Sequence, residues 1–578
     1  MSSLVEFFTE NLSPKQNLYE AIRALAFKEG EIEEISKKFG YKSSSLKTLI
    51  SEVLSGKKVL FSEDRKGPQA RRTNNDTCKM IINLRRNEQL NSEEIAVKLN
   101  LKGIEISSRT IERILKDFGF PKLHRRTNKQ RGLTKKETFI PLKAEKLNFK
   151  ELKCFKADCQ IAGIFFFLPY ILETGILEIV KECNLPESSV IRNIQAALSM
   201  LLLKLIGSER LSHIDKYDHD VGFGIFAGLG VLPKPTYMCN YSCRTEANML
   251  LEFQKKAIKK LMELYPDLYC GETINLDFHS IPHYGNESSM EKVWCGAKGK
   301  SLKGANSFFA QSANTGNLLY TRADIKRAES SEEIKKFVDY WIELKGVINE
   351  TLVFDSRLTR YDILHDLDRE NVKFITLRTR SEKLIKETLL IPDEKWQKEY
   401  LPIPKRKHKR VSVYETTTVL VKKEKPFRQL IIKDHGRAEP TFIVTNNWDL
   451  KITDILIIYA KRWHIENKIS ELVNFFNVNS LSSPIMIRIH FDILWTIIAD
   501  TLYKLFMQDL RRFEVSTSAK IFRKFIDMPG RIFYDQKSFI LKIRKRATTP
   551  VLMGVKKLKE PIIIPWLNNL PLKIVWTP

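Results

Sequence analysis

The chain has 578 residues, of which 43% are hydrophobic and 10% aromatic, a composition typical of folded globular domains rather than of disordered chains. Lys and Arg number 96 against 69 Asp and Glu, which gives a formal net charge of +27. Such an excess of positive charge indicates a polyanionic partner, with nucleic acid as the first candidate.

The same numbers speak against secreted, disulfide-stapled and membrane-spanning proteins. Eight cysteines in a chain of this length are too few and too scattered for a disulfide framework, which predicts a reduced, cytoplasmic setting. The first residues lack a basic start followed by an apolar run, so no signal peptide is expected. The most apolar stretch, 161–177, is interrupted by Pro169 and Glu173, so no membrane partner is expected.

Two helical units are predicted in the N-terminal region, at 1–60 and 75–121. In each unit apolar residues recur at helical spacing, and glycines such as Gly30 and Gly40 divide the helices. Each unit fits a helix-turn-helix plan. In the second unit Ser107 can cap a recognition helix. The residues of this helix predicted to reach DNA are Arg109, Thr110 and Arg113.

Basic links follow the two helical units, at 61–74 and 122–146. They are predicted to follow phosphates, and Arg125 and Arg126 are the candidate contacts in the second link. Residues 147–270 then show helical periodicity without catalytic residue types. We expect this region to be a helical spacer between the DNA-reading units and a catalytic core.

Two acidic residues follow strand-like runs in the central region. Residues 273–278 are β-prone and place Asp277 near a strand end, and residues 351–355 place Asp355 at another. Between them lie a hairpin, 308–323, and an amphipathic helix; a further helix and strand follow. This order predicts a mixed sheet and resembles the ribonuclease-H-like arrangement, in which the first and fourth strands are neighbours. Asp277 and Asp355 are therefore expected to lie together.

A third acid is predicted on a later helix, 453–477. On this helix Arg462 and Glu466 are four residues apart, and Tyr459 lies seven residues before Glu466, so all three share one face. The face can present Glu466 to the two aspartates while Arg462 meets a phosphate. Core packing remains the alternative for Tyr459 and for Trp463.

Three converging carboxylates predict a metal site, because they repel one another unless cations neutralise them. Their hard oxygen ligands suit Mg²⁺ or Mn²⁺. Two such ions can activate a water or a 3′-hydroxyl and stabilise the leaving oxygen at phosphorus. We therefore predict Asp277, Asp355 and Glu466 as both catalytic residues and ligands of two ions.

The run Tyr459, Arg462, Glu466 resembles the Tyr-Arg-Glu signature of the DDE transposases of bacterial insertion sequences, and Asp277 and Asp355 stand where that family has its first two acids. The resemblance implies a ribonuclease-H-like core at 271–379 and 441–480, interrupted by a β-rich insertion at 380–440 that helps hold the opened transposon end. The insertion segment expected to contact DNA is the basic run 405–410, with Lys407, Lys409 and Arg410 as its main contacts.

The resemblance also implies a homodimer on paired double-stranded DNA, with transposon ends and target as substrates. Residues 481–578 are predicted to form a helical and basic C-terminal tail. The sequence thus predicts a multidomain bacterial protein, cytoplasmic and associated with the nucleoid, that cuts and joins DNA. Two alternatives remain: a helix-turn-helix transcription regulator or inactive transposase-derived DNA-binding protein, and a metal-dependent nuclease without strand transfer.

Overall fold

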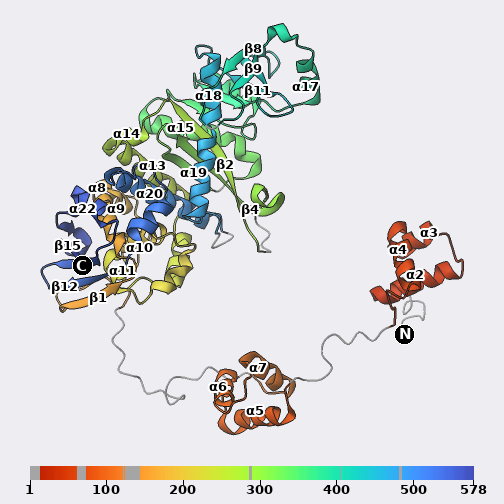
Figure 1. Cartoon of the computed structure of the whole chain (residues 1–578), viewed down its shortest axis with the longest axis vertical. Helices are drawn as coiled ribbons and strands as arrows, with labels where there is room; N and C mark the ends of the chain where they lie inside the picture. Colours follow the sequence, from red (N-terminus) through yellow and green to blue (C-terminus); the bar gives the residue numbers. More distant parts are fainter. Residues whose placement is uncertain are drawn as a thin grey trace. The chain divides into compact units, whose positions relative to one another are not determined.

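The computed structural model of the chain describes residues 13–61, 73–121, 123, 143–285, 290–323, 325–404, 406–480 and 485–578. The chain divides into two compact units, Met1–Thr138 and Phe139–Pro578 (Figure 1). The division falls within the predicted basic link 122–146. Each unit is described by itself below.

The described residues of the first unit form two groups of three helices, as the periodicity predicted. The helices are α2 Pro14–Ala26, α3 Ile32–Lys38, α4 Ser43–Leu54, α5 Asn75–Glu88, α6 Ser92–Asn100 and α7 Ser108–Asp117. Each group has its own small apolar core, one around Leu18 and Leu46 and the other around Ile95 and Ile111. The Ser107 hydroxyl accepts a hydrogen bond from the Thr110 backbone N–H, which caps α7 as expected.

The second unit combines many helices with two sheets. Its helices are α8 Leu168–Thr174, α9 Ile176–Glu182, α10 Asn193–Leu205, α11 Val221–Ala227, α12 Pro235–Tyr241, α13 Ala247–Leu264, α14 Pro266–Tyr269, α15 Glu333–Lys345, α16 Tyr361–Arg369, α17 Glu382–Leu389, α18 Ile452–Lys461, α19 Trp463–Asn474, α20 Met486–Asp509, α21 Ser518–Ile521 and α22 Thr549–Gly554. Its strands are β1 Phe155–Cys159, β2 Thr273–Pro282, β3 Lys292–Cys295, β4 Lys300–Ser312, β5 Leu318–Arg322, β6 Thr351–Val353, β7 Phe374–Leu377, β8 Gln397–Tyr400, β9 Arg410–Thr418, β10 Phe427–Lys433, β11 Thr441–Thr445, β12 Gly530–Tyr534, β13 Phe539–Arg544, β14 Ile562–Ile564 and β15 Leu570–Thr577.

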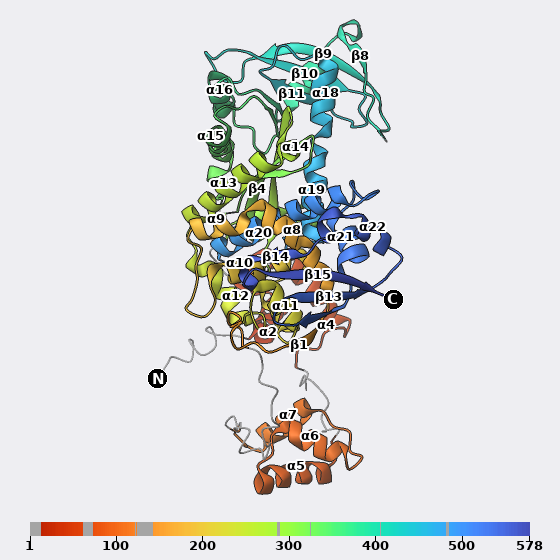
Figure 2. The same ribbon diagram turned by 90° about the vertical axis from the view of Figure 1, so that its left-hand side faces the viewer.

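The larger sheet is mixed, as expected, and has the strand order β3-β4-β2-β6-β7-β11-β10-β9-β8, with β5 paired to β4. The first and fourth strands of the predicted order, β2 and β6, are parallel neighbours. Strands β8 to β10 were expected in a separate insertion, yet they continue the same sheet because β11 pairs with both β7 and β10. In both views α18 lies beside this outer part of the sheet (Figure 2).

The predicted spacer, 147–270, is not a separate region. Its apolar residues, among them Phe167 and Leu201, belong to the same buried cluster as residues of β2 and α20. Helix α20 is buried on nearly all sides, and the Tyr503 hydroxyl donates a hydrogen bond to the Leu205 carbonyl of α10. Helical periodicity shows that a helix has an apolar face, but it does not show which other element that face packs against.

The C-terminal region is not the helical tail that the sequence predicted. After α21 it forms a five-stranded sheet of order β1-β12-β13-β15-β14, and β1 comes from the region expected to be a spacer. In β13 buried residues, Phe539, Leu541 and Ile543, alternate with Lys542 and Arg544. This period of two was masked in the sequence by the run of basic residues, which was interpreted as a surface patch.

Among the described residues, no single helix is both long and apolar enough to cross a membrane. The bent pair Ala162–Thr174 and Ile176–Glu182, with an angle of 60° between its halves, passes the same criteria of length and composition.

Candidate active site

The parallel pairing of β2 with β6 brings Asp277 and Asp355 to the same level of the sheet. Asn275 of β2 is paired with Val353 of β6, and the two aspartates each follow two residues later. The expectation that Asp277 lies at a strand end was wrong, since β2 continues to Pro282 along β4. At Asp277, β2 is still paired with β4, but its pairing with β6 has ended at Asn275. Asp277 therefore lies beside the end of β6.

Asp277 is largely buried, with 15% of its side-chain surface exposed. Burial, together with the negative charges of Asp355 and Glu466, raises the pKa of Asp277 to about 7, against the opposing effect of Arg462. Because Asp355 and Glu466 both act on this pKa, the three acids predicted from the sequence lie in one electrostatic neighbourhood.

Tyr459, Arg462 and Glu466 come from two successive helices, not from the single helix 453–477 that was predicted. Helix α18 ends at Lys461 and α19 begins at Trp463, with Arg462 between them. Hydrogen bonds of three-residue spacing tighten the chain here, from the Arg462 N–H to the Tyr459 carbonyl and from the Ile465 N–H to the Arg462 carbonyl. The backbone of Arg462 stays α-helical in its dihedrals, so the predicted shared face largely survives.

Arg462 lies between two of the acids. Its Nη1 is 3.4 Å from Asp277 Oδ2 and its Nη2 is 2.5 Å from Glu466 Oε1. Burial alone would lower the pKa of Arg462, but Tyr459, Asp277, Glu466 and Asp355 together raise it well above its ordinary value. The guanidinium is therefore a fixed positive charge among the carboxylates.

The donor set fits a divalent cation in its chemistry, because three carboxylates of separate elements share one site and one of them is hard to ionise there. The positions of these carboxylates differ from those of a formed metal site, because no three His, Cys, Asp or Glu side chains within the described part of the chain are grouped closely enough to hold a metal ion. Arg462 accounts for the spacing, since its guanidinium stands between Asp277 and Glu466.

A pocket of about 620 Å³ opens beside these residues and is lined by Asp355, Glu466, Tyr459 and Arg462. Basic and aromatic residues complete its wall: Arg406, Lys407, His408, His435, Arg437 and Trp463. Trp463 is 48% exposed, so the alternative of core packing is wrong for this residue. In this basic wall, Arg406, Lys407 and His408 belong to the run 405–410 that was expected to contact DNA. His435 and Arg437 were not predicted, because they come from a loop that reaches the site only through the sheet.

The other predicted DNA-contacting residues lie outside this pocket. Lys409 and Arg410 are exposed at the start of β9. On α7, Arg109 and Arg113 are exposed, while the Thr110 hydroxyl is 2.9 Å from the Ser107 hydroxyl of the helix cap. Arg125 and Arg126 lie outside the described residues.

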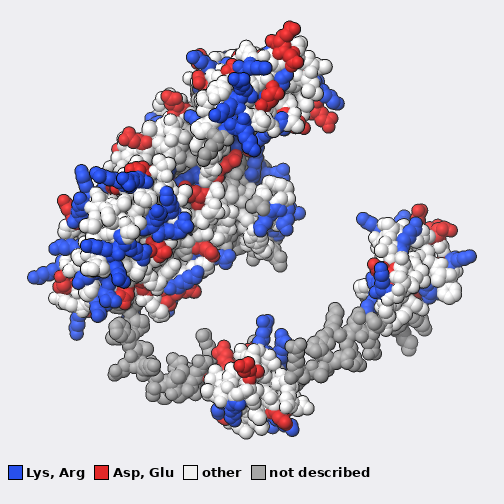
Figure 3. Space-filling model, viewed as in Figure 1, with Lys and Arg blue, Asp and Glu red and all other residues white. Residues whose placement is uncertain are grey.

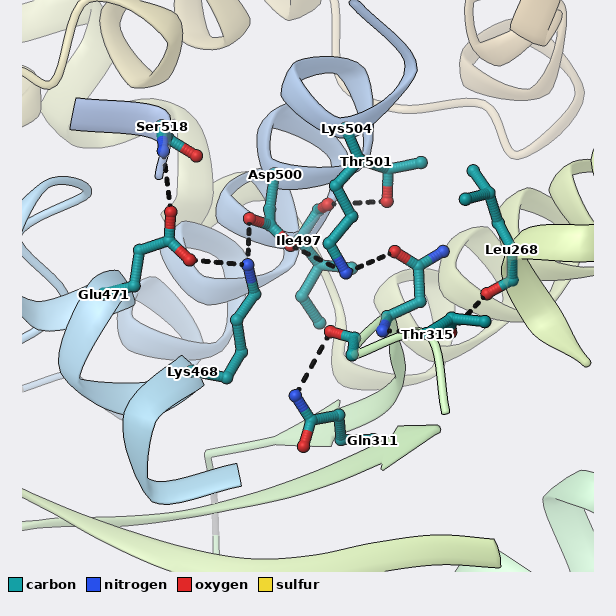
Figure 4. A network of polar contacts seen from close by, with 12 residues as sticks. Leu268, Gln311, Thr315, Lys468, Glu471, Ile497, Asp500, Thr501, Lys504 and Ser518 are labelled. Atoms are coloured by element: carbon teal, nitrogen blue, oxygen red, sulfur yellow. Dashed lines mark hydrogen bonds and ion pairs between the residues drawn. The ribbon is translucent and has the colours of Figure 1, made fainter. Parts of the chain in front are cut away.

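A buried polar network fixes α19 behind the site (Figure 4). Lys468 Nζ lies 2.5 Å from Asp500 Oδ1 of α20 and 3.0 Å from Glu471 Oε2. Lys504 Nζ donates to Asn317 Oδ1 at 2.6 Å, which ties α20 to the β4–β5 turn. Lys468 follows Glu466 by two residues, so the network holds the helix turn that carries the third acid.

Residues 269–502 match the family model described as "Transposase DDE domain". The match includes Asp277, Asp355 and Glu466, and it confirms the resemblance to DDE transposases expected from the sequence; the Tyr-Arg-Glu signature stays a prediction. No curated protein matches the chain.

Among solved structures, the chain is similar to a piggyBac transposase synaptic complex with hairpin DNA at 10% identity, with a TM-score of 0.35, covering 64% of this chain and 82% of that one. It is similar to a Mos1 transposase paired-end complex with the left transposon end at 8% identity, with a TM-score of 0.13, covering 63% of this chain and 78% of that one.

Proposed function

We propose that this chain, which carries a transposase DDE domain at residues 269–502, is a DNA transposase that cleaves DNA at transposon ends and joins these ends to a target. One observation carries the proposal: Arg462 contacts both Asp277 and Glu466 and lines one pocket with Asp355 and Glu466, so three acids distant in sequence share one site within the matched domain. Such a group is suited to metal-dependent phosphoryl transfer.

In this proposal Asp277, Asp355 and Glu466 would hold two Mg²⁺ or Mn²⁺ ions, which would supply activation of the attacking oxygen and stabilisation of the leaving oxygen. The chain's own residues orient the DNA. Arg462 turns from the carboxylates to a phosphate, and the Tyr459 ring, 6.0 Å from its guanidinium carbon, supports its side chain. Trp463 offers an exposed ring at the mouth of the pocket, which keeps water from part of the site.

The remaining basic residues position the substrate. Lys407 extends the positive wall of the pocket, and exposed Lys409 and Arg410 continue it along β9. In the first unit, Arg109 and Arg113 are exposed on one short helix, where they can meet a groove of the terminal repeat. We infer that two copies assemble on two paired DNA ends, so that each active site acts on one end.

Replacement of Glu466 by Gln tests the mechanism. The substrate is a duplex carrying the element's own terminal repeats, incubated with MgCl₂ or MnCl₂. Gln keeps the shape but removes the negative charge, so cleavage is expected to fall by about 10³-fold or more. Asp454→Asn, an exposed acid of α18 outside the pocket, is the matched control and should cleave like the wild type.

The products separate the proposal from its two rivals. A transposase yields ends joined to target DNA, whereas a nuclease without strand transfer yields only free ends. A regulator binds the repeats with no cleavage by either protein. Equal cleavage by the wild type and the Glu466→Gln variant would remove the proposed mechanism.

A further inference from the structure

The C-terminal sheet has one face in the core and one face in solvent. Its inner face contributes Ile532, Leu541 and Leu572 to the main buried cluster. Trp576 packs on this side against Phe166, with ring centroids 5.9 Å apart. The alternating residues therefore point outward, because side chains of successive strand residues lie on opposite faces.

Five of the eleven outward residues of four adjacent strands are cationic, against one acid. Lys542 of β13 lies opposite Arg531 of β12 and Val575 of β15, and Lys573 of β15 lies opposite Ile540. Lys156 of β1 extends the row through Phe533. We call these cations the basic sheet face: Lys156, Arg531, Lys542, Arg544 and Lys573, all exposed. In Figure 3, Lys and Arg gather over the part of the second unit where Figure 1 labels β12, β15 and α22.

This positive charge is not neutralised within the described chain. The strands of the sheet contain a single acid, Asp158, which forms an ion pair with Arg531 at 2.7 Å. For Lys156, Lys542, Arg544 and Lys573, the described residues provide no ion-pair partner. A flat surface with four unpaired cations on three strands attracts a partner that carries regularly spaced negative charge.

We propose that the basic sheet face binds the phosphate backbone of double-stranded DNA, independently of its sequence. Protein partners are disfavoured, because protein interfaces are depleted in Lys and have apolar centres. Single strands are disfavoured as well, since they need several exposed aromatic rings to stack on. The face has one such ring, Phe533, and Lys542 Nζ covers it at 4.5 Å from the ring centroid.

The inference rests on the proposed function only in its choice of DNA as the partner. The face belongs to the C-terminal sheet, and none of its cations lines the pocket of the three acids. It would add phosphate contacts to those of the active site and of the first unit. Its cations need no metal, so binding can be tested separately from cleavage.

The test uses the full chain with Glu466→Gln, so that binding is measured without cleavage of the DNA. The probe is a duplex of about 30 base pairs without terminal repeats. The variant K542Q/R544Q/K573Q should flatten the slope of log binding constant against log salt by up to about 3. K256Q/K259Q/K260Q removes the same charge from α13 and should retain the parental slope. Equal slopes for both triple variants and the parent would overturn the proposal.

Photocrosslinking provides a second measurement that does not depend on variant stability. A photoreactive phenylalanine analogue at Val575, which is 39% exposed on this face, should crosslink to the duplex. The same probe at Val347, 51% exposed elsewhere in the second unit, should not. Crosslinks from position 575 to a second copy of the chain instead of DNA would show an interface between copies, and the proposal would fall. Equal cleavage by the wild type and the Glu466→Gln variant would remove the proposed function but would leave both of these binding readouts unaffected, so the two failures are distinguishable.

Discussion

Arg462 illustrates how one residue can balance a cluster of acids. Its two terminal nitrogens reach Asp277 and Glu466, and its side chain is only 15% exposed. A buried charge is stable when paired, so the guanidinium and the carboxylates stabilise one another. A divalent cation carries the same kind of charge to the same oxygens, and the two should therefore compete.

Replacing Arg462 by Gln should make the protein more dependent on metal. Without metal, the variant should unfold at a lower temperature than the wild type, since the carboxylates lose their counter-charge. With MnCl₂, its melting temperature should rise more than that of the wild type, because no guanidinium has to be displaced. Thermal unfolding with and without MnCl₂ measures both values. An equal rise in melting temperature in the two proteins would contradict competition between Arg462 and the metal. The control is Arg357→Gln, which removes a nearby arginine that donates a hydrogen bond to Asn306.

The sequence located the three acids better than it located their surroundings. Strand-like runs and helical spacing were sufficient to predict that Asp277, Asp355 and Glu466 share one neighbourhood, because these signals are local. Their roles in catalysis and metal binding stay a prediction. The part of the pocket wall formed by His435 and Arg437 could not be predicted. These residues reach the pocket through antiparallel pairing of distant strands, which periodicity in a single segment does not encode.

At the level of elements, α19 and α20 are joined by a cluster of buried charges. Around Lys504 lie Asp500 of its own helix, Lys468 and Glu471 of α19, and Asn317 of the β4–β5 turn. Burial, with a smaller contribution from the positive charge of Lys468, lowers the pKa of Lys504 to about 7. The group should then influence stability in a defined pH range.

Replacing Lys504 by Met should stabilise the protein in a pH-dependent way. The pKa of Lys504 in the folded protein, about 7, lies below the ordinary lysine value of 10.5, so the unfolded chain binds the proton more tightly between these two values. The wild type therefore carries the full cost of the buried charge below pH 7 and loses it as the pH rises toward 10.5. Urea unfolding at pH 6.5 and 9.5 measures the difference between variant and wild type, which should be larger at pH 6.5.

The matched control for this comparison is Lys259→Met, at an exposed position of α13. Its effect on the free energy of unfolding should not change between the two pH values. A Lys504→Met effect that is equal at both pH values, or larger at pH 9.5, would mean that the lysine is protonated throughout.

Elements with a clear amphipathic period were predicted, and those that depend on distant partners were not. The six helices of the first unit and the strands β2 and β6 follow from local spacing. Strand β1 has only five residues and is completed by β12, almost four hundred positions later, so its own sequence carries little signal. Strands β12 and β13 had the alternating pattern, but the region that contains them was predicted to be helical and basic.

At the scale of the whole molecule, two units divide the work that the proposed function requires. The first unit has two small helical cores, whereas the second contains the three acids, the pocket and the basic sheet face. Sequence-specific contacts are expected from α7, and sequence-independent contacts from the sheet face and the pocket wall. Recognition and general DNA affinity should therefore be separable by cutting the chain between residues 138 and 139.

A protein consisting of residues 139–578 should fold and bind DNA without preferring the terminal repeats. Its core is continuous from the helices around Phe167 to the C-terminal sheet, so unfolding should be one cooperative transition. Competition between repeat-bearing and random duplexes should give a ratio near unity, against a marked preference for the full chain. The triple variant of the sheet face in this shorter protein should lower both affinities alike. A retained preference for the repeats would place recognition in the second unit and contradict the division, because the sheet face and pocket wall read phosphates and not bases.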